Sequence, residues 1–171
     1  TRIWSPGISV TTLHKRVTID AQGEWQLGGH NLNAIGYMNA NLNAWQPCFA
    51  TQAKMRTAAA GDSSALAGVN ALERARCTIN TNIFRDYSFW VEAADFFKLR
   101  SVSVTLDLPA RFLFGARNGS IAVAGRNLYT STKYTGTDPE SADQRDDTFA
   151  RRDYYVFPTS RSFTMTIRLG F

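Results

Sequence analysis

Long apolar runs are absent from this chain of 171 residues, and their absence excludes the commonest way of crossing a membrane. A spanning helix needs roughly 18 or more consecutive apolar residues, and no window of the sequence comes near that length. The chain also opens on Thr1-Arg2-Ile3-Trp4 and not on a basic and then apolar leader. We therefore expect either a protein whose leader has been removed or a fragment of a longer one.

Histidine and cysteine are scarce, with two residues of each. His14 and His30 fall in separate turns or loops, and neither cysteine has a catalytic partner nearby. The chain has no glycine-rich phosphate loop and no nucleophile elbow. We therefore predict no enzyme, with no catalytic, cofactor-binding or metal-binding residues. Cys48 and Cys77 either remain thiols or form a disulfide, which would need an oxidising compartment and would stabilise its segment by roughly 3–4 kcal/mol.

Acidic residues are in the minority, and the net charge is +5. The basic residues are scattered singly, without the stripe that nucleic-acid binding requires, so we predict no nucleic-acid partner. The clearest acidic cluster consists of Asp138, Glu140, Asp143, Asp146 and Asp147, interleaved with arginines. Such a cluster is typical of a solvated loop of mixed charge, and we favour that interpretation over a Ca²⁺ or ligand site.

Strict alternation of apolar and polar residues is the strongest pattern present. It runs over 17–27 and again over 162–171. A transmembrane strand needs about 9–11 residues, with apolar side chains toward lipid and polar ones toward the lumen. Both runs meet these conditions. A soluble antiparallel sheet with one wet face would give the same alternation, so the surroundings must decide.

Three further strands are predicted, at 8–13, 97–108 and 120–130. The alternation of apolar and polar residues shifts by one position between Leu99 and Val102, which predicts a β-bulge there. Gly125-Arg126 is the expected position of a second irregularity, and the facing of that strand stays open. Aromatic residues fall near the strand ends, as in the interfacial girdles of membrane barrels. They are Trp25, Phe97, Tyr129 and Phe163 at one end and Phe112, Phe114 and Phe171 at the other.

The connections alternate between short and long. A tight turn at 14–16 is followed by a long loop over 28–95, a short link over 109–119 and a second long loop over 131–161. Outer-membrane barrels have short periplasmic turns and long extracellular loops, whereas compact soluble domains rarely contain loops of this size. One short helix is predicted over 64–76, with Asp62 or Ser63 as its N-cap. We therefore predict an all-β fold, a fragment of an antiparallel transmembrane β-barrel with a periplasmic C-terminus.

The second half of the chain carries a recognisable series of motifs. Their order and spacing resemble the C-terminal signature of SusC/RagA-type TonB-dependent receptors, most specifically over 90–171. The matching residues are Leu108-Pro109, Asn127-Leu128, Thr132-Lys133-Tyr134, Gly136, Asp138-Pro139 and Phe171. The segment between the two cysteines has no match in this pattern.

This resemblance implies a bacterial outer-membrane barrel of about 22 strands with a plugged lumen, of which these would be about the last five. It implies import of a nutrient such as an oligosaccharide or a peptide. The implied partners are outer-membrane lipid, the rest of the barrel and plug, TonB through a missing N-terminal part, a SusD-like surface lipoprotein, and the barrel-assembly machinery.

Particular residues receive roles from the barrel interpretation. The polar positions of the two clearest strands would face the lumen or the plug, where they stay hydrated or hydrogen-bonded. These lumen-facing residues are Asp20, Gln22, Glu24, Thr164, Thr166 and Arg168. Phe171 either serves as the signal read by the assembly machinery, which we favour, or anchors the last strand at the interface.

An alternative from another class is a secreted soluble β-sandwich that binds carbohydrate or protein through its long loops. The apolar faces of strands 17–27 and 163–171 would then have to meet in one core. The barrel instead places both faces against lipid.

Overall fold

A computed structural model describes residues 1–12, 16–78, 87–113, 115–140 and 151–171, and it divides into two compact units. The sheet unit comprises 1–29, 95–133 and 159–171. The loop unit comprises 30–94 and 134–158. His14, Phe114 and the acidic residues Asp143, Asp146 and Asp147 lie outside the described residues.

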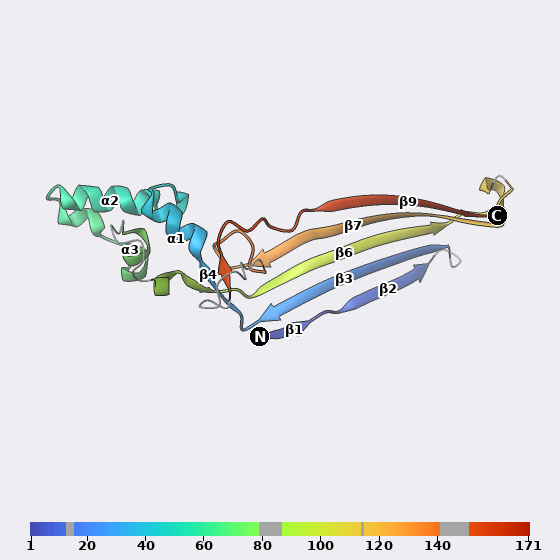
Figure 1. Ribbon diagram of the computed structural model, residues 1–171, viewed down its shortest axis with the longest axis horizontal. Coiled ribbons are helices and arrows are strands. Elements are labelled where there is room, and N and C mark those ends of the chain that lie inside the picture. The colour runs from blue at the N-terminus through green and yellow to red at the C-terminus, as the bar shows by residue number, and fades with distance from the viewer. Residues whose placement is uncertain (13–15, 79–86, 114, 141–150) are drawn as a thin grey trace. The chain divides into compact units, whose positions relative to one another are not determined.

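The sheet unit is an antiparallel sheet with the order β1-β3-β6-β7-β9, and β2 also pairs with β3 (Figure 1). Its strands are β1 (Arg2–Trp4), β2 (Gly7–Thr12), β3 (Val17–Leu27), β6 (Phe96–Asp107), β7 (Asn118–Thr132) and β9 (Ser162–Gly170). A short 3-10 turn, Ala110–Phe112, follows β6. β1 and β2 lie along the same edge of β3 and are separated at Ser5-Pro6. Proline cannot donate to a ladder, but the Pro6 carbonyl accepts a hydrogen bond from the Gly23 N–H at 3.0 Å.

The predicted bulge between Leu99 and Val102 is confirmed. Leu99 pairs with Tyr129, whereas Ser101 pairs with Arg126, so Arg100 lies opposite two residues of β7. The second irregularity falls just after the predicted Gly125-Arg126, at Asn127, whose φ is 53°. Asparagine tolerates this left-handed conformation better than most residues. The paired irregularities keep Leu99 and Val102 on one face of the sheet.

Side chains of opposite character separate onto the two faces of the sheet. One register row joins Ile19, Val104, Val123 and Met165, and the adjacent row joins Asp20, Ser103, Ala124 and Thr164. The facing of β7 is thereby fixed, with Ile121 and Val123 on the apolar face. This face is uncovered: Ile8, Met165 and Ile167 are 67%, 65% and 60% exposed.

The loop unit combines a small sheet with three α-helices. The sheet has the order β5-β4-β8, with strands β4 (His30–Asn33), β5 (Val91–Ala93) and β8 (Arg152–Asp153). The helices are α1 (Ala34–Asn41), α2 (Phe49–Ala59) and α3 (Ala71–Cys77). Three 3-10 turns, Gln46–Cys48, Ser63–Leu66 and Tyr87–Trp90, complete the unit. No helix among the described residues is long and apolar enough to cross a membrane.

The prediction of one short helix over 64–76 is wrong. Asp62 does act as an N-cap, because its carboxylate accepts a hydrogen bond from the Ser64 N–H at 3.1 Å, but the segment it starts is only a 3-10 turn. Gly68 then takes a φ of +77°, which breaks the helical path. The α-helix begins afterwards, with Asn70 as its N-cap. Helices α1 and α2 were not predicted at all, because neither has a continuous apolar stripe.

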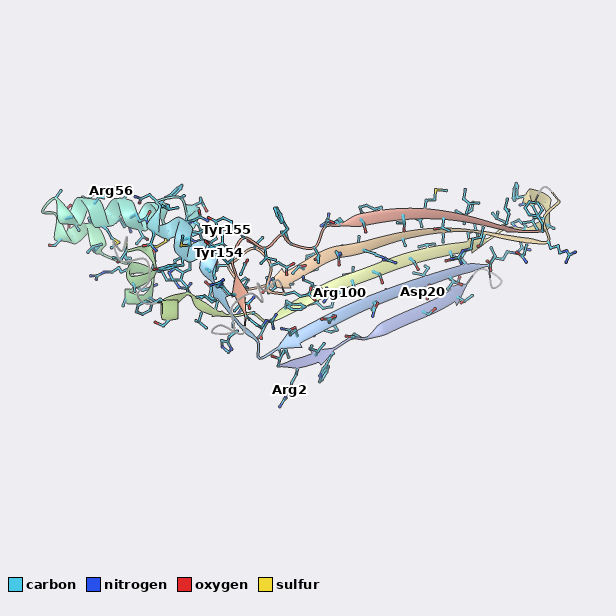
Figure 2. The ribbon with its side chains drawn as sticks, in the orientation of Figure 1. Arg2, Asp20, Arg56, Arg100, Tyr154 and Tyr155 are labelled. Atoms are coloured by element: carbon cyan, nitrogen blue, oxygen red, sulfur yellow. A yellow bond between two sulfur atoms is a disulfide. The ribbon has the colours of Figure 1, made fainter. Side chains whose placement is uncertain are left out.

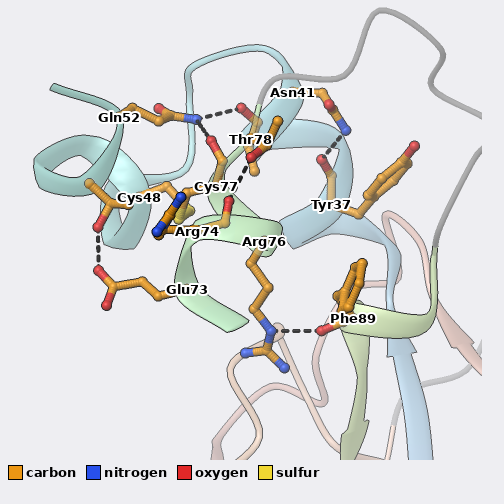
Figure 3. Close-up of a disulfide and its surroundings, with 12 residues drawn as sticks. Tyr37, Asn41, Cys48, Gln52, Glu73, Arg74, Arg76, Cys77, Thr78 and Phe89 are labelled. Carbon is orange, nitrogen blue, oxygen red and sulfur yellow. Dashed lines mark hydrogen bonds between the residues drawn. A yellow bond between two sulfur atoms is a disulfide. The ribbon is translucent and has the colours of Figure 1, made fainter. Parts of the chain in front are cut away.

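A disulfide between Cys48 and Cys77 joins the helices of the loop unit, and their Cα atoms lie 5.3 Å apart (Figure 3). Around it lies a core built from Leu32, Tyr37 and Trp90, with Trp45 packed against it. The Gln52 side chain donates to the backbone carbonyls of Ala40 and Cys77, at 2.9 and 3.2 Å. The three helices are therefore held by one covalent bond and by hydrogen bonds from a buried amide.

Candidate functional site

The polar face of the sheet carries all six residues predicted to face a lumen. Asp20 and Thr164 share a register row, and strict alternation along β3 and β9 places the other four on the same face. Asp20 also accepts a hydrogen bond from the Ser103 hydroxyl at 3.3 Å. The structure thus brings residues from the two ends of the sequence onto one polar surface.

An ion pair crosses this polar face. Glu24 accepts two hydrogen bonds from Arg100, from Nη2 at 2.9 Å and from Nε at 3.1 Å. Arg100 is the additional residue of β6 opposite β3, where Gly23 pairs with Leu99 and Gln22 with Ser101, and Figure 2 labels it on the sheet together with Asp20. Sequence reasoning selected Glu24 but missed its partner, because the partner is 76 residues away. The phase slip in β6 was the only signal that pointed to this position.

The apolar face ends in aromatic side chains. Trp25 and Phe97 are cross-strand neighbours whose ring centroids lie 4.4 Å apart, and Phe163 is 71% exposed. At the opposite end Phe171 is 83% exposed. The eight-residue interval from Phe163 to Phe171 corresponds to about 26 Å along a strand, or about 20 Å across a membrane at a tilt near 40°. This length is close to the apolar band of about 25 Å in membrane barrels.

Buried acids of the loop unit hold the segment that follows β7. Glu92 accepts hydrogen bonds from the Thr135 N–H and hydroxyl, at 2.9 and 2.7 Å. Asp153 is fully buried and accepts from the Thr137 N–H at 2.8 Å and from the Tyr134 hydroxyl at 3.3 Å. Burial raises the pKa of Asp153, and burial together with the nearby Asp153 raises the pKa of Tyr134.

The segment that follows β7 is also closely packed. A Cβ added to Gly136 would lie 2.5 Å from Asp153 Oδ2 and 2.5 Å from the Tyr134 ring. The carbonyl of Pro139 accepts from Asn31 at 3.1 Å. The motif residues Tyr134, Gly136 and Pro139 therefore build a fixed turn on the loop unit. Sequence reasoning noted this motif but did not find its acidic partners.

Further polar contacts surround the disulfide. Arg76 donates from Nε to the Phe89 carbonyl at 2.6 Å (Figure 3). Arg76 also forms an ion pair with Glu92 at 3.4 Å. Its guanidinium carbon lies 5.5 Å from the Trp90 ring centroid. Next to these groups is a hollow of about 240 Å³, lined by Trp45, Cys48, Leu72, Arg76, Cys77 and Trp90 among others.

The acidic cluster can be followed only in part. The Asp138 carboxylate accepts from the Glu140 N–H at 2.9 Å, which forms a local turn. Within the described ranges, no group of three or more His, Cys, Asp or Glu residues is arranged to hold a metal ion. His30 is exposed at the start of β4.

Comparison with known proteins identifies the class to which this architecture is similar. No family model matches the chain. Its sequence is similar to that of TonB-dependent receptor P3 from Formosa agariphila, with 34% identity over 91 residues. The match covers 49% of this chain and 9% of the receptor. The resemblance to TonB-dependent receptors is therefore confirmed.

Solved structures of the RagAB peptide transporter have a similar fold. One matches with a TM-score of 0.60 and 20% identity, over 91% of this chain and 16% of that chain. The closed-closed and open-open states of the RagAB peptide importer match with TM-scores of 0.55 and 0.52, each at 19% identity, over 91% and 99% of this chain. They cover 16% and 17% of those chains. The likeness is one of fold, and this chain spans about a sixth of the length of these structures.

Proposed function

We propose that this chain forms part of the barrel wall and the extracellular loops of an outer-membrane TonB-dependent transporter that imports a nutrient such as an oligosaccharide or a peptide. One observation carries the proposal: an exposed apolar face continues across all the strands of the sheet unit, with a polar face behind it. Lipid is the environment that stabilises an exposed apolar face that spans several strands and is about as long as the apolar band of a membrane barrel.

The edges of the sheet support a position within a larger barrel. Within the part of the chain that the structure describes, β9 pairs only with β7, and β1 and β2 pair only with β3. An unpaired strand edge is not tolerated in lipid, so further strands must continue the sheet on both sides. These strands would come from the rest of the protein, together with the plug and the segment that contacts TonB.

In this proposal the polar face borders the lumen. Asp20, Gln22 and Glu24 on β3 face the plug or lumen water, as do Thr164, Thr166 and Arg168 on β9. Substrate would be captured by the loops and the plug, and energy delivered through TonB would rearrange the plug. This part of the chain supplies wall and loops, and the Glu24–Arg100 pair gives the wall a fixed charged surface.

The orientation and the partners complete the proposal. The C-terminus lies in the periplasm, and the loop unit lies outside, where a SusD-like lipoprotein would cap it. The solved structures with a similar fold are of the RagAB peptide transporter, which is the kind of system in which we expect such a partner. Exposed Phe171 would be read by the barrel-assembly machinery during insertion.

The soluble sandwich is disfavoured by one specific observation. In a sandwich the apolar faces of β3 and β9 would oppose each other across a core. In the structure they lie on the same face of a single sheet, with β6 and β7 between them.

Charge substitution at one pair of adjacent residues tests the proposal in the full-length protein. Ile167 is on the apolar face, midway between Phe163 and Phe171, and Thr166 is its neighbour on the polar face. Ile167→Arg places a charge in lipid at a cost of about 2–4 kcal/mol and should strongly lower the amount in the outer membrane. Thr166→Arg should leave that amount near wild type. Equal tolerance of both substitutions, or a water-soluble wild-type protein, would refute the proposal.

A further inference from the structure

Arg2 is the only charged side chain in the described part of the sheet that falls in the rows of the apolar face. Arg2 pairs with Leu27, and Trp4 pairs with Trp25. Directly paired residues of an antiparallel sheet share a face, so all four lie on the apolar face. An arginine in this position is costly in lipid unless its guanidinium reaches the headgroup layer, where it meets phosphate.

A hollow separates these four side chains. Its volume is about 270 Å³, and its walls are Arg2, Trp4, Trp25 and Leu27. Trp4 is 68% exposed, whereas Trp25 is held in place by its contact with Phe97. Among the residues that the structure describes, Arg2 has no ion-pair partner, and Figure 2 labels it on β1, at the edge of the sheet.

The size and the chemistry of the hollow define its ligand. Pockets for whole small molecules occupy about 300–1,000 Å³, so this hollow suits part of a larger amphiphile. Indole rings favour the membrane interface, where one end of the ring is apolar and the other is wet. A guanidinium binds a phosphate through two parallel hydrogen bonds, which a lysine cannot do.

We propose that Arg2, Trp4, Trp25 and Leu27 bind one phosphate-bearing lipid of the surrounding leaflet, with an acyl chain between the indoles and the phosphate on Arg2. This inference rests on the proposed membrane function. It adds a specific lipid site to a wall that would otherwise contact lipid without selectivity. The competing occupant is a side chain from the strand that continues the sheet beyond β1.

Native mass spectrometry of the full-length protein in detergent tests the site, with phosphatidic acid and diacylglycerol as probes, because diacylglycerol has the same acyl chains and no phosphate. The wild type should retain phosphatidic acid preferentially. Arg2→Gln should weaken phosphatidic acid binding about fivefold, which corresponds to about 1 kcal/mol for one interfacial arginine, and should leave diacylglycerol binding unchanged. Trp4→Ala should weaken the binding of both lipids. Arg56→Gln, the same change of charge on the exposed surface of α2, serves as the matched control.

The outcomes separate this inference from the proposed function. If Arg2→Gln binds phosphatidic acid as tightly as the wild type while the protein still fractionates with the outer membrane, the lipid site is refuted and the transporter proposal stands. That result would mean that the neighbouring strand fills the hollow. If the wild-type protein does not fractionate with the outer membrane, both fall. A loss in Arg2→Gln that Arg2→Lys only partly restores supports bidentate recognition of phosphate.

Discussion

Removal of the Cys48–Cys77 disulfide should destabilise the loop unit without affecting the sheet. The two cysteines are 29 positions apart and both are buried, at 2% and 3% exposure. A cross-link of that length lowers the conformational entropy of the unfolded segment enough to stabilise it by about 3.5 kcal/mol. Their pairing also fixes α3 against the 3-10 turn that precedes α2. The loss should therefore fall on the helices.

Hydrogen exchange in the full-length protein is the assay. In a Cys48→Ser/Cys77→Ser variant, amides of α2 and α3 should exchange faster by up to about 300-fold, because 1.4 kcal/mol corresponds to a factor of ten. Amides of β6, which belong to the sheet unit, serve as the internal control and should not change. An acceleration below about threefold in the helices, or an equal acceleration in β6, would refute the reasoning.

Three further predictions concern the loop unit and the C-terminus. Gly136→Ala should destabilise the loop unit by about 1–3 kcal/mol in hydrogen exchange, because its Cβ would meet Asp153 at 2.5 Å, whereas Gly7→Ala, where the nearest atom is 3.9 Å away, should be tolerated. Folding raises the pKa of the Asp153 carboxyl above its ordinary value of 3.8. The protonated carboxyl therefore contributes its full stabilisation below pH 3.8, and this stabilisation is lost as the pH rises through the raised pKa. Loop-unit protection, corrected for intrinsic exchange, should fall over that range, and Asp153→Asn should flatten the dependence; an unchanged slope would contradict this. Deletion of Phe171 should lower the yield in the outer membrane while Phe171→Trp preserves it, and an unaffected deletion would rule out the assembly role.

The strands could be predicted because their information is local. A period of two is visible in the residues themselves, and β3 covers the range 17–27 in which the alternation is strict. The phase slip at Leu99 located the bulge for the same reason, since an added residue must shift every later side chain to the other face. The irregularity in β7 lies at Asn127 and not at the predicted Gly125-Arg126. Its position depends on which residue adopts the left-handed φ, and here that residue is an asparagine.

The loop unit could not be predicted because its stability comes from contacts that are distant in sequence. Helix α2 lacks an apolar stripe. It is held in place by the hydrogen bond from Gln52 to the Cys77 carbonyl and by the disulfide between Cys48 and Cys77. The bond between Thr135 and Glu92 joins residues 43 positions apart. The motif around Gly136 was visible in the sequence. The reason that a glycine is needed there was not visible, because it is the close approach of the buried Asp153.

Solvent and lipid accessibility along β9 distinguishes a sheet with one face in lipid and the other toward water from a sheet that is packed in a protein core. Spin labels would be placed at successive positions from 163 to 169 in the full-length protein, in its membrane. We expect a period of two, with labels at Phe163, Met165, Ile167 and Leu169 accessible to oxygen dissolved in lipid, and labels at Thr164, Thr166 and Arg168 accessible to a water-soluble relaxation agent. If neither agent reached the labels at the apolar positions, this face would lie in a protein core and not in lipid.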